Sequence, residues 1–114
     1  MDLLLPSGTA SGEVNEGGHA VTHNATEDDL IDALAAMERG DIEYVILEDP
    51  ANNMFMQAAG DGHSGYALQY NPGADDSMFQ ARGKMSGTQI TDAFVAFLNK
   101  DISWRTSLVW ERYQ

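Results

Sequence analysis

The three histidines are the side chains in this sequence best suited to hold a metal ion or to transfer a proton. His19 and His23 are four residues apart, and His63 lies in a glycine-rich stretch further along. In an extended segment, the side chains at positions 19 and 23 share a face but lie about 13 Å apart, too far to bind one ion together. A helix would bring them closer, but Gly17 and Gly18 just before them disfavour a helix. We therefore predict no metal site and no cofactor.

The glycine-rich stretch GDGHSG, residues 60–65, has the composition of a phosphate-binding loop or of a turn that carries a catalytic serine. Both motifs need a strand before them and a helix after them, and the phosphate loop usually includes a lysine. Here the next segment, GYALQY, alternates like a strand, and the stretch has no lysine. We predict a flexible hairpin connection. The chain also lacks cysteine, which excludes thiolate catalysis, and we expect no enzymatic activity.

Acidic side chains occur in pairs near the ends of predicted strands. A glycosidase needs two carboxyl groups that face each other across a cleft, and adjacent residues on a solvated turn do not supply this arrangement. The alternative is a collective role, in which these pairs join the acids of the first predicted helix in one partner-binding surface. The residues of this predicted surface are Glu27, Asp28, Asp29, Asp32, Glu48, Asp49, Asp75 and Asp76.

The net charge of −12 is unevenly distributed along the chain. Residues 1–81 contain fifteen acids and one base, a sum of −14, whereas residues 82–114 contain three acids and five bases, a sum of +2. A field of this sign repels nucleic acid and anionic membranes and attracts a basic protein. The acidity also has a simpler explanation, because a high net charge keeps a small protein soluble.

Targeting segments are not evident in the sequence. The apolar run Leu3–Leu5 is followed at once by Pro6, so it is too short for the core of a signal peptide. No other run approaches the roughly 18 apolar residues of a membrane-spanning helix. We therefore predict a cytoplasmic protein, and the absence of cysteine fits a reducing compartment.

The segment from Glu43 to Ala81 predicts four consecutive strands, around YVILE, MFMQAA, GYALQY and SMFQA. Proline, asparagine and glycine residues separate the first strand from the second and the third from the fourth, and they favour tight turns. Connections this short join antiparallel neighbours only, because a parallel crossover needs a dozen or more residues. The segment therefore predicts an antiparallel meander.

Two amphipathic helices flank this meander, over residues 26–39 and 87–100. Thr26 with Asp29, and Ser86 with Gln89, have the spacing of capping boxes. The apolar residues of each helix recur at i, i+3, i+4 and i+7, which predicts one buried stripe per helix. We expect both helices to cover the same face of the sheet, because both are joined to it by short connections.

We predict that residues 1–18 form a flexible N-terminal arm and that residues 19–114 form one α+β domain. Its expected order is (β)-α-β-β-β-β-α, with a four- or five-stranded antiparallel sheet whose edge includes a short strand near residues 19–23. The tail 101–114 is rich in apolar residues, so we expect it to pack over the sheet as an extended segment or a short strand. Either this tail or a second subunit would then shield the face that the helices leave uncovered. An open strand edge would favour a symmetric homodimer.

The chain resembles a group of small bacterial proteins, the α+β immunity-type proteins of polymorphic-toxin systems. The segments that carry the resemblance are NATEDDLIDAL (24–34), YVILE (44–48), MFMQAAG (54–60), YALQY (66–70), AFVAFL (93–98) and WRTSLVWE (104–111). Glutamate often occupies the place of Gln69 in that group, and the pattern consists of apolar and turn residues across about residues 19–112. The resemblance implies a protein that binds a partner protein and has no active site of its own.

These observations lead to two functional hypotheses. The first is an immunity-type binding protein whose acidic surface docks a cationic toxin domain, with buried aromatic residues setting the lifetime of the complex. The alternative is a structural or assembly protein that acts through homo-oligomerisation, with the acidity serving solubility alone. In both hypotheses the chain binds neither nucleic acid nor membrane.

Overall fold

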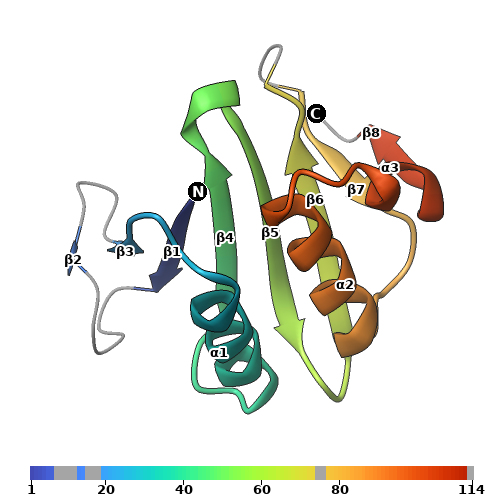
Figure 1. The fold of residues 1–114 in the computed structure, drawn as a ribbon. Coiled ribbons are helices and arrows are strands. Elements are labelled where there is room, and N and C mark those ends of the chain that lie inside the picture. The colour runs from blue at the N-terminus through green and yellow to red at the C-terminus, as the bar shows by residue number, and fades with distance from the viewer. Residues whose placement is uncertain (7–12, 15–18, 74–76, 113–114) are drawn as a thin grey trace.

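The computed structural model describes residues 1–6, 13–14, 19–73 and 77–112 (Figure 1). The fold is α+β, as predicted, but the sheet is larger than the expected four or five strands. It has eight strands in the order β2-β3-β1-β4-β5-β6-β7-β8, and all neighbouring strands pair antiparallel. The strands are β1 (Asp2–Pro6), β2 (Glu13–Val14), β3 (His19–Thr22), β4 (Tyr44–Asp49), β5 (Met54–Asp61), β6 (Gly65–Asn71), β7 (Phe79–Ala81) and β8 (Trp110–Arg112).

The meander β4-β5-β6-β7 confirms the predicted antiparallel strands. A short 3-10 turn, Pro50–Asn52, joins β4 to β5, and Asn53 follows it in the left-handed region with φ of 54°. The glycine-rich stretch forms a hairpin connection between β5 and β6, as expected, with Asp61 paired to Gly65. Because these turns fix the register, Ile46, Gln57 and Gln69 lie side by side across three strands.

The N-terminus corrects the prediction of a flexible arm. Residues 2–6 form β1, which lies inside the sheet between β3 and β4, and Leu3 and Leu4 are 2% and 5% exposed. The carbonyl oxygen of Met1 also accepts a hydrogen bond of 2.8 Å from the backbone N–H of Ala25. The predicted strand near residues 19–23 is β3, but β2 pairs with its outer side, so β3 is not the edge. Residues 7–12 and 15–18 of the predicted arm lie outside the described part of the chain.

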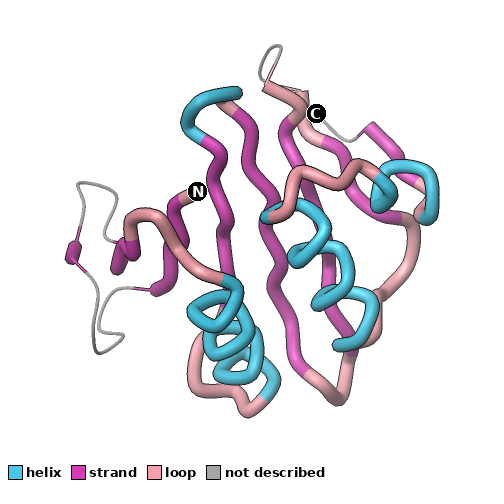
Figure 2. The backbone as a smooth tube through the Cα atoms, in the orientation of Figure 1, coloured by secondary structure: helices cyan, strands magenta, loops and turns pink. Residues whose placement is uncertain are grey.

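The two long helices, α1 (Glu27–Glu38) and α2 (Gly87–Leu98), lie side by side on one face of the sheet, as predicted (Figure 2). Both expected capping boxes are present. The backbone N–H of Asp29 donates to Thr26 Oγ1 at 3.1 Å, and that of Gln89 donates to Ser86 Oγ at 3.2 Å. The buried stripes of the helices pack against the sheet to form the core. Its largest fully buried side chains include Leu30, Met37, Leu47, Met56, Tyr66, Leu68, Ile90 and Phe94.

The C-terminal segment contains the predicted short strand, but it also forms a helix and pairs at the edge of the sheet instead of packing over its open face. It forms a short helix, α3 (Ser103–Ser107), and then β8, which pairs with β7 at the edge of the sheet. Trp104 is 3% exposed and packs edge-on against Tyr70 and Trp110, with ring centroids 4.7 Å and 5.7 Å away. This aromatic cluster belongs to the same core as the helices. The segment therefore closes the far end of the core, and among the described residues it does not cover the other face of β4, β5 and β6.

Candidate functional site

The acidic residues predicted at the start of the first helix lie on one exposed surface. Glu27, Asp28 and Asp32 are exposed on α1, and within the described part of the chain their side chains form no hydrogen bond or ion pair. Asp29 is half-buried, and its carboxylate caps the helix by accepting the N–H of Thr26 at 2.9 Å. We call Glu27, Asp28 and Asp32 the α1 acidic surface. Glu27 and Asp28 lie in the first turn, where the helix dipole favours carboxylates, so they are stable there without partners.

The strand-end acids do not join the α1 acidic surface. Glu48 alternates along β4 with buried Leu47, so its side chain lies on the face of the sheet opposite the helices. Asp49 is buried and accepts a hydrogen bond of 2.7 Å from Asn52 Nδ2, which gives it a role in the turn. Asp75 and Asp76 lie outside the described residues. The predicted single surface is therefore divided, and partner binding by its members stays a prediction.

Further acids surround α1 that were not included in the predicted surface. Within β1, α1 and the loops that flank them (residues 1–6 and 23–43), eight carboxylates accompany one arginine, a sum of −7. These acids are Asp2, Glu27, Asp28, Asp29, Asp32, Glu38, Asp41 and Glu43. Arg39 is bound locally to Asp41 at 3.0 Å. The excess of acids near α1 can be counted in the sequence. That Asp2 on β1 belongs to the same region can be seen only in the fold.

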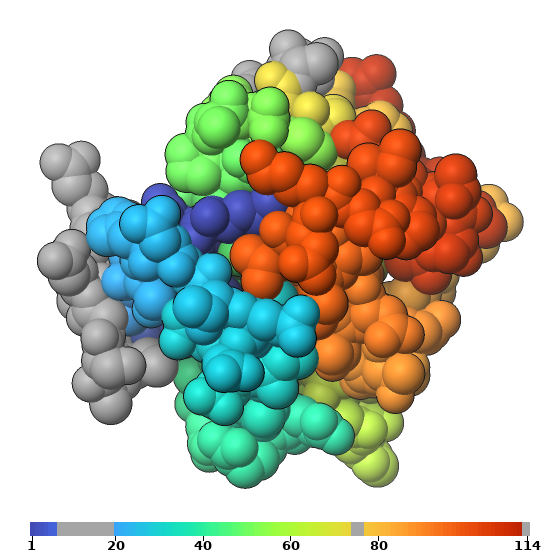
Figure 3. All heavy atoms as spheres, viewed as in Figure 1, coloured from blue at the N-terminus to red at the C-terminus, as the bar shows by residue number. Residues whose placement is uncertain are grey.

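The uneven charge along the chain becomes an uneven charge across the molecule. From β1 onward, the order of the strands in the sheet follows the order of the chain, so early and late segments lie at opposite ends. Figure 3 shows α1 on one side of the helical face, in blue-green, and α2 with α3 on the other, in orange and red. The five bases after residue 81 lie along the chain in or beside α2, α3 and β8. The α1 side is therefore the negative pole of the protein.

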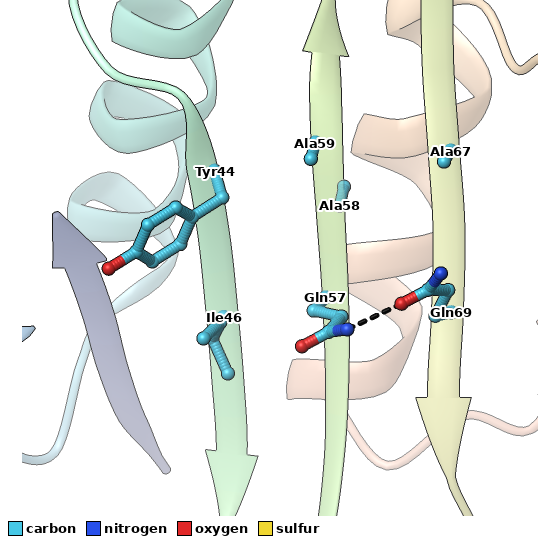
Figure 4. Close-up of a pocket in the computed structure, with 7 residues that line it drawn as sticks. All are labelled: Tyr44, Ile46, Gln57, Ala58, Ala59, Ala67 and Gln69. Atoms are coloured by element: carbon cyan, nitrogen blue, oxygen red, sulfur yellow. Dashed lines mark hydrogen bonds between the residues drawn. The ribbon is translucent and has the colours of Figure 1, made fainter. Parts of the chain in front are cut away.

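The face of the sheet opposite the helices carries a shallow hollow of about 300 Å³. It is lined by uncharged residues of β4, β5 and β6, and Figure 4 shows how they lie: Tyr44, Ile46, Gln57, Ala58, Ala59, Ala67 and Gln69. Small alanines form the floor, and the Tyr44 ring leans away from them toward β1 (Figure 4). We call this surface the open-face hollow.

A row of three glutamines borders this hollow. Gln57 Nε2 donates to Gln69 Oε1, and Gln69 Nε2 donates to Gln80 Oε1 at 3.0 Å. The three residues are directly opposite one another on β5, β6 and β7, so the hydrogen bonds run across the sheet. Cross-strand pairs of this kind stabilise a sheet and hold its side chains in one orientation. The row gives the open face a rigid, neutral surface. The alternation of residues along a single strand did not predict it, because the row runs across three strands.

The polar groups of the glycine-rich connection, residues 60–65, stabilise the turn between β5 and β6. Asp61 Oδ1 accepts the backbone N–H groups of His63 and Ser64 at 2.9 Å and 2.6 Å, which closes the turn. These hydrogen bonds, first that from Ser64, lower the pKa of the Asp61 carboxyl. His63 is exposed, and among the described residues no group of three or more histidine or acidic side chains is placed to hold a metal ion.

The hydroxyl of Tyr66 is a buried polar group in the core. Tyr66 is 2% exposed, and its Oη has no hydrogen-bond partner among the described residues. Burial raises the pKa of this phenol, and the nearby carboxylates of Glu38 and Asp61 raise it further. The folded protein therefore favours the protonated phenol. This preference stabilises the folded protein. The stabilisation is fully present at pH values below the pKa of the phenol in the unfolded chain, about 10, and it is lost as the pH rises through the higher pKa of the phenol in the folded protein.

We expect Tyr66→Phe to leave stability at pH 7 within about 1 kcal/mol of the parent, because it removes a hydroxyl that makes no hydrogen bond. Between pH 9 and 11 the variant should lose less stability than the parent, since it has no phenol to ionise at this position. Urea unfolding at a series of pH values measures both effects. Parallel losses of stability in parent and variant would contradict this account of Tyr66.

Comparisons with protein-family models, with curated proteins and with solved structures found no match to this chain. Within the ranges that the structure describes, no helix is long and apolar enough to span a membrane.

Proposed function

We propose that this chain is a non-enzymatic binding protein of the immunity type, which neutralises a cationic toxin domain in the cytoplasm. The observation that carries the proposal is the negative pole around α1, where Glu27, Asp28 and Asp32 are exposed on a helix whose opposite stripe is buried in the core. These carboxylates can contact a partner without any rearrangement of the fold.

Electrostatics gives such a surface a definite role. An excess of one sign of charge steers an oppositely charged protein toward it and raises the rate of association, while apolar contacts mainly set the rate of dissociation. The positive segments of this chain lie on the other side of the molecule, so they weaken the attraction at α1 less than an even distribution would. A cationic nuclease domain has the complementary charge for this pole.

We expect a gene beside that of this chain to encode the cationic toxin domain, and the proposal is tested with this domain. We expect the triple variant Glu27→Lys, Asp28→Lys and Asp32→Lys to weaken binding at least about tenfold, because like charges then face the basic partner. The fold should survive, since all three side chains are exposed. Calorimetric titration gives the dissociation constant, and rescue of toxin-expressing cells gives the biological effect.

A matched control separates the location of the charge from its amount. Asp92→Lys, Asp101→Lys and Glu111→Lys also replace three exposed acids, but these acids lie in the segment after residue 81, and both triple variants have a net charge of −12 + 6 = −6. The control should bind the toxin more tightly than the α1 variant. Equal weakening of binding in the two variants would show that the α1 acidic surface has no special role. Binding unchanged in both variants would show that charge does not contribute to recognition of the toxin.

A further inference from the structure

The open face of the sheet differs from the rest of this acidic protein. The seven residues that line the open-face hollow carry no charge, although the chain as a whole has a net charge of −12. The glutamine row that borders the hollow is neutral as well, and its amides already bond to one another. Two copies of a chain with this net charge repel each other least where their surfaces are neutral.

We propose that the open face is the interface of a symmetric homodimer, with a two-fold axis along β5. Such an axis places β4 of one copy over β6 of the other at the same height along the strands. Tyr44 and Ala67 both pair with Ala59 of β5, and Ile46 and Gln69 both pair with Gln57. The axis therefore places Tyr44 of one copy over Ala67 of the other, and Ile46 over Gln69. Large side chains of β4 thus face small or neutral side chains of β6, as interdigitation between packed sheets requires.

The same axis keeps Glu48 of one copy away from Glu48 of the other. Glu48 lies level with Phe55 on β5 and with Asn71 on β6, so each Glu48 faces an asparagine across the interface. Beyond them, the negative β1 side of one copy lies over the β7 side of the other, where Arg82 pairs with Glu111 at 3.3 Å. Asp61 lies on β5 itself, so its two copies approach each other near the axis, and each already binds the N–H groups of its own turn. The axis therefore opposes unlike or neutral groups along β4 and β6.

The size of the face indicates a weak dimer. Four strands, β4 to β7, spaced about 4.8 Å apart and contributing about six residues each at 3.4 Å per residue, give a surface of roughly 400 Å² per copy. The total of about 800 Å² is below the usual size of a specific interface, so we expect a transient dimer with a dissociation constant weaker than about 1 micromolar. Added salt should strengthen association, since it screens the repulsion between the two acidic copies.

Sedimentation equilibrium of the full chain, from micromolar to millimolar concentration, tests the proposal. The parent should form dimers, and Ala59→Arg should weaken association at least about tenfold, because the two arginines would meet near the axis. Ile31→Arg is the control, since it adds the same charge to the helical face. A parent that stays monomeric at all concentrations would overturn the proposal, and so would an equal effect of the two variants.

Distances between spin labels test the position of the axis without disturbing the interface. The chain has no cysteine, so Ser64→Cys at the tip of the β5–β6 hairpin accepts a single label. Two such labels should lie within roughly 25 Å of each other, since packed sheets are about 10 Å apart. Labels at Asp32→Cys, on the helical face, should be much further apart. The reverse order of distances would overturn this interface in favour of another.

These measurements need no toxin, so their failure is distinct from a failure of the proposed function. If the parent were monomeric and Ala59→Arg abolished toxin binding, the open face would belong to the toxin and the dimer would be rejected.

Discussion

Phe94→Ala is expected to lower the free energy of unfolding by roughly 3–5 kcal/mol and the melting temperature by roughly 10–20 °C. The Phe94 side chain is fully buried in the centre of α2, where it packs in the core between the helices and the sheet. Alanine would leave a cavity there, and the loss is a large fraction of the stability of a small domain. Urea unfolding followed by circular dichroism measures the change.

Val95→Ala is the matched control on the same helix. Val95 is half-buried at the margin of the core, so we expect a loss of about 1 kcal/mol or less. Phe97→Ala, at a second buried position, should resemble Phe94→Ala. Similar small losses at all three positions would contradict the packing of α2 against the sheet.

Gly60→Ala should destabilise the protein by roughly 3–5 kcal/mol, because it combines backbone strain with a steric clash. Gly60 has a φ of +139°, and a Cβ atom at this position would lie 2.3 Å from the carbonyl oxygen of Gly65. That oxygen belongs to the paired strand of the hairpin, so it cannot move without breaking the ladder that carries the open face. Urea unfolding gives the change in stability.

Gly83→Ala is a matched control, since Gly83 also has a positive φ of +77° but no atom within 4 Å of a built Cβ. Only the conformational cost of about 1–2 kcal/mol should remain at this position. The difference between the two variants therefore measures the clash at the β5–β6 hairpin. Equal losses would show that the hairpin can open to admit a side chain.

The elements that the sequence predicted are those with local signals. Thr26 and Ser86 each begin a helix with a capping box, and the apolar stripe that follows is explicit in the spacing of the residues. The meander was also predictable, because proline, asparagine and glycine mark two of its turns and a glycine-rich stretch the third. In each case the physical cause lies within a few residues of its effect.

The strand β1 was missed because its signal is not local. Leu3 and Leu4 lie on opposite faces of the sheet, and both are buried. A strand buried on both faces has no alternation, so a run of leucines cannot be distinguished from an apolar tail. The short helix α3 was missed as well, since its five residues span little more than one turn.

The candidate surfaces differ in how far the sequence predicts them. The exposure of Glu27, Asp28 and Asp32 follows from helical periodicity alone. The separation of Glu48 from them follows from its alternation with Leu47, and it could have been inferred once β4 was recognised. The open-face hollow depends on the register of three strands, which the turns determine, so no single segment contains its signal.

The most direct test of the central claim is the association rate constant of the neighbouring toxin domain, measured by stopped flow at ionic strengths of about 0.01 M and 0.15 M. The Debye length falls from about 30 Å to about 8 Å over this range, so the rate constant of the parent should fall steeply. At low salt, Glu27→Lys, Asp28→Lys and Asp32→Lys together should slow association more than the Asp92, Asp101 and Glu111 control, with little change in dissociation. An association rate that responds neither to salt nor to the α1 reversal would contradict capture by the α1 acidic surface, and it would leave the acidity of this chain as a means of staying soluble.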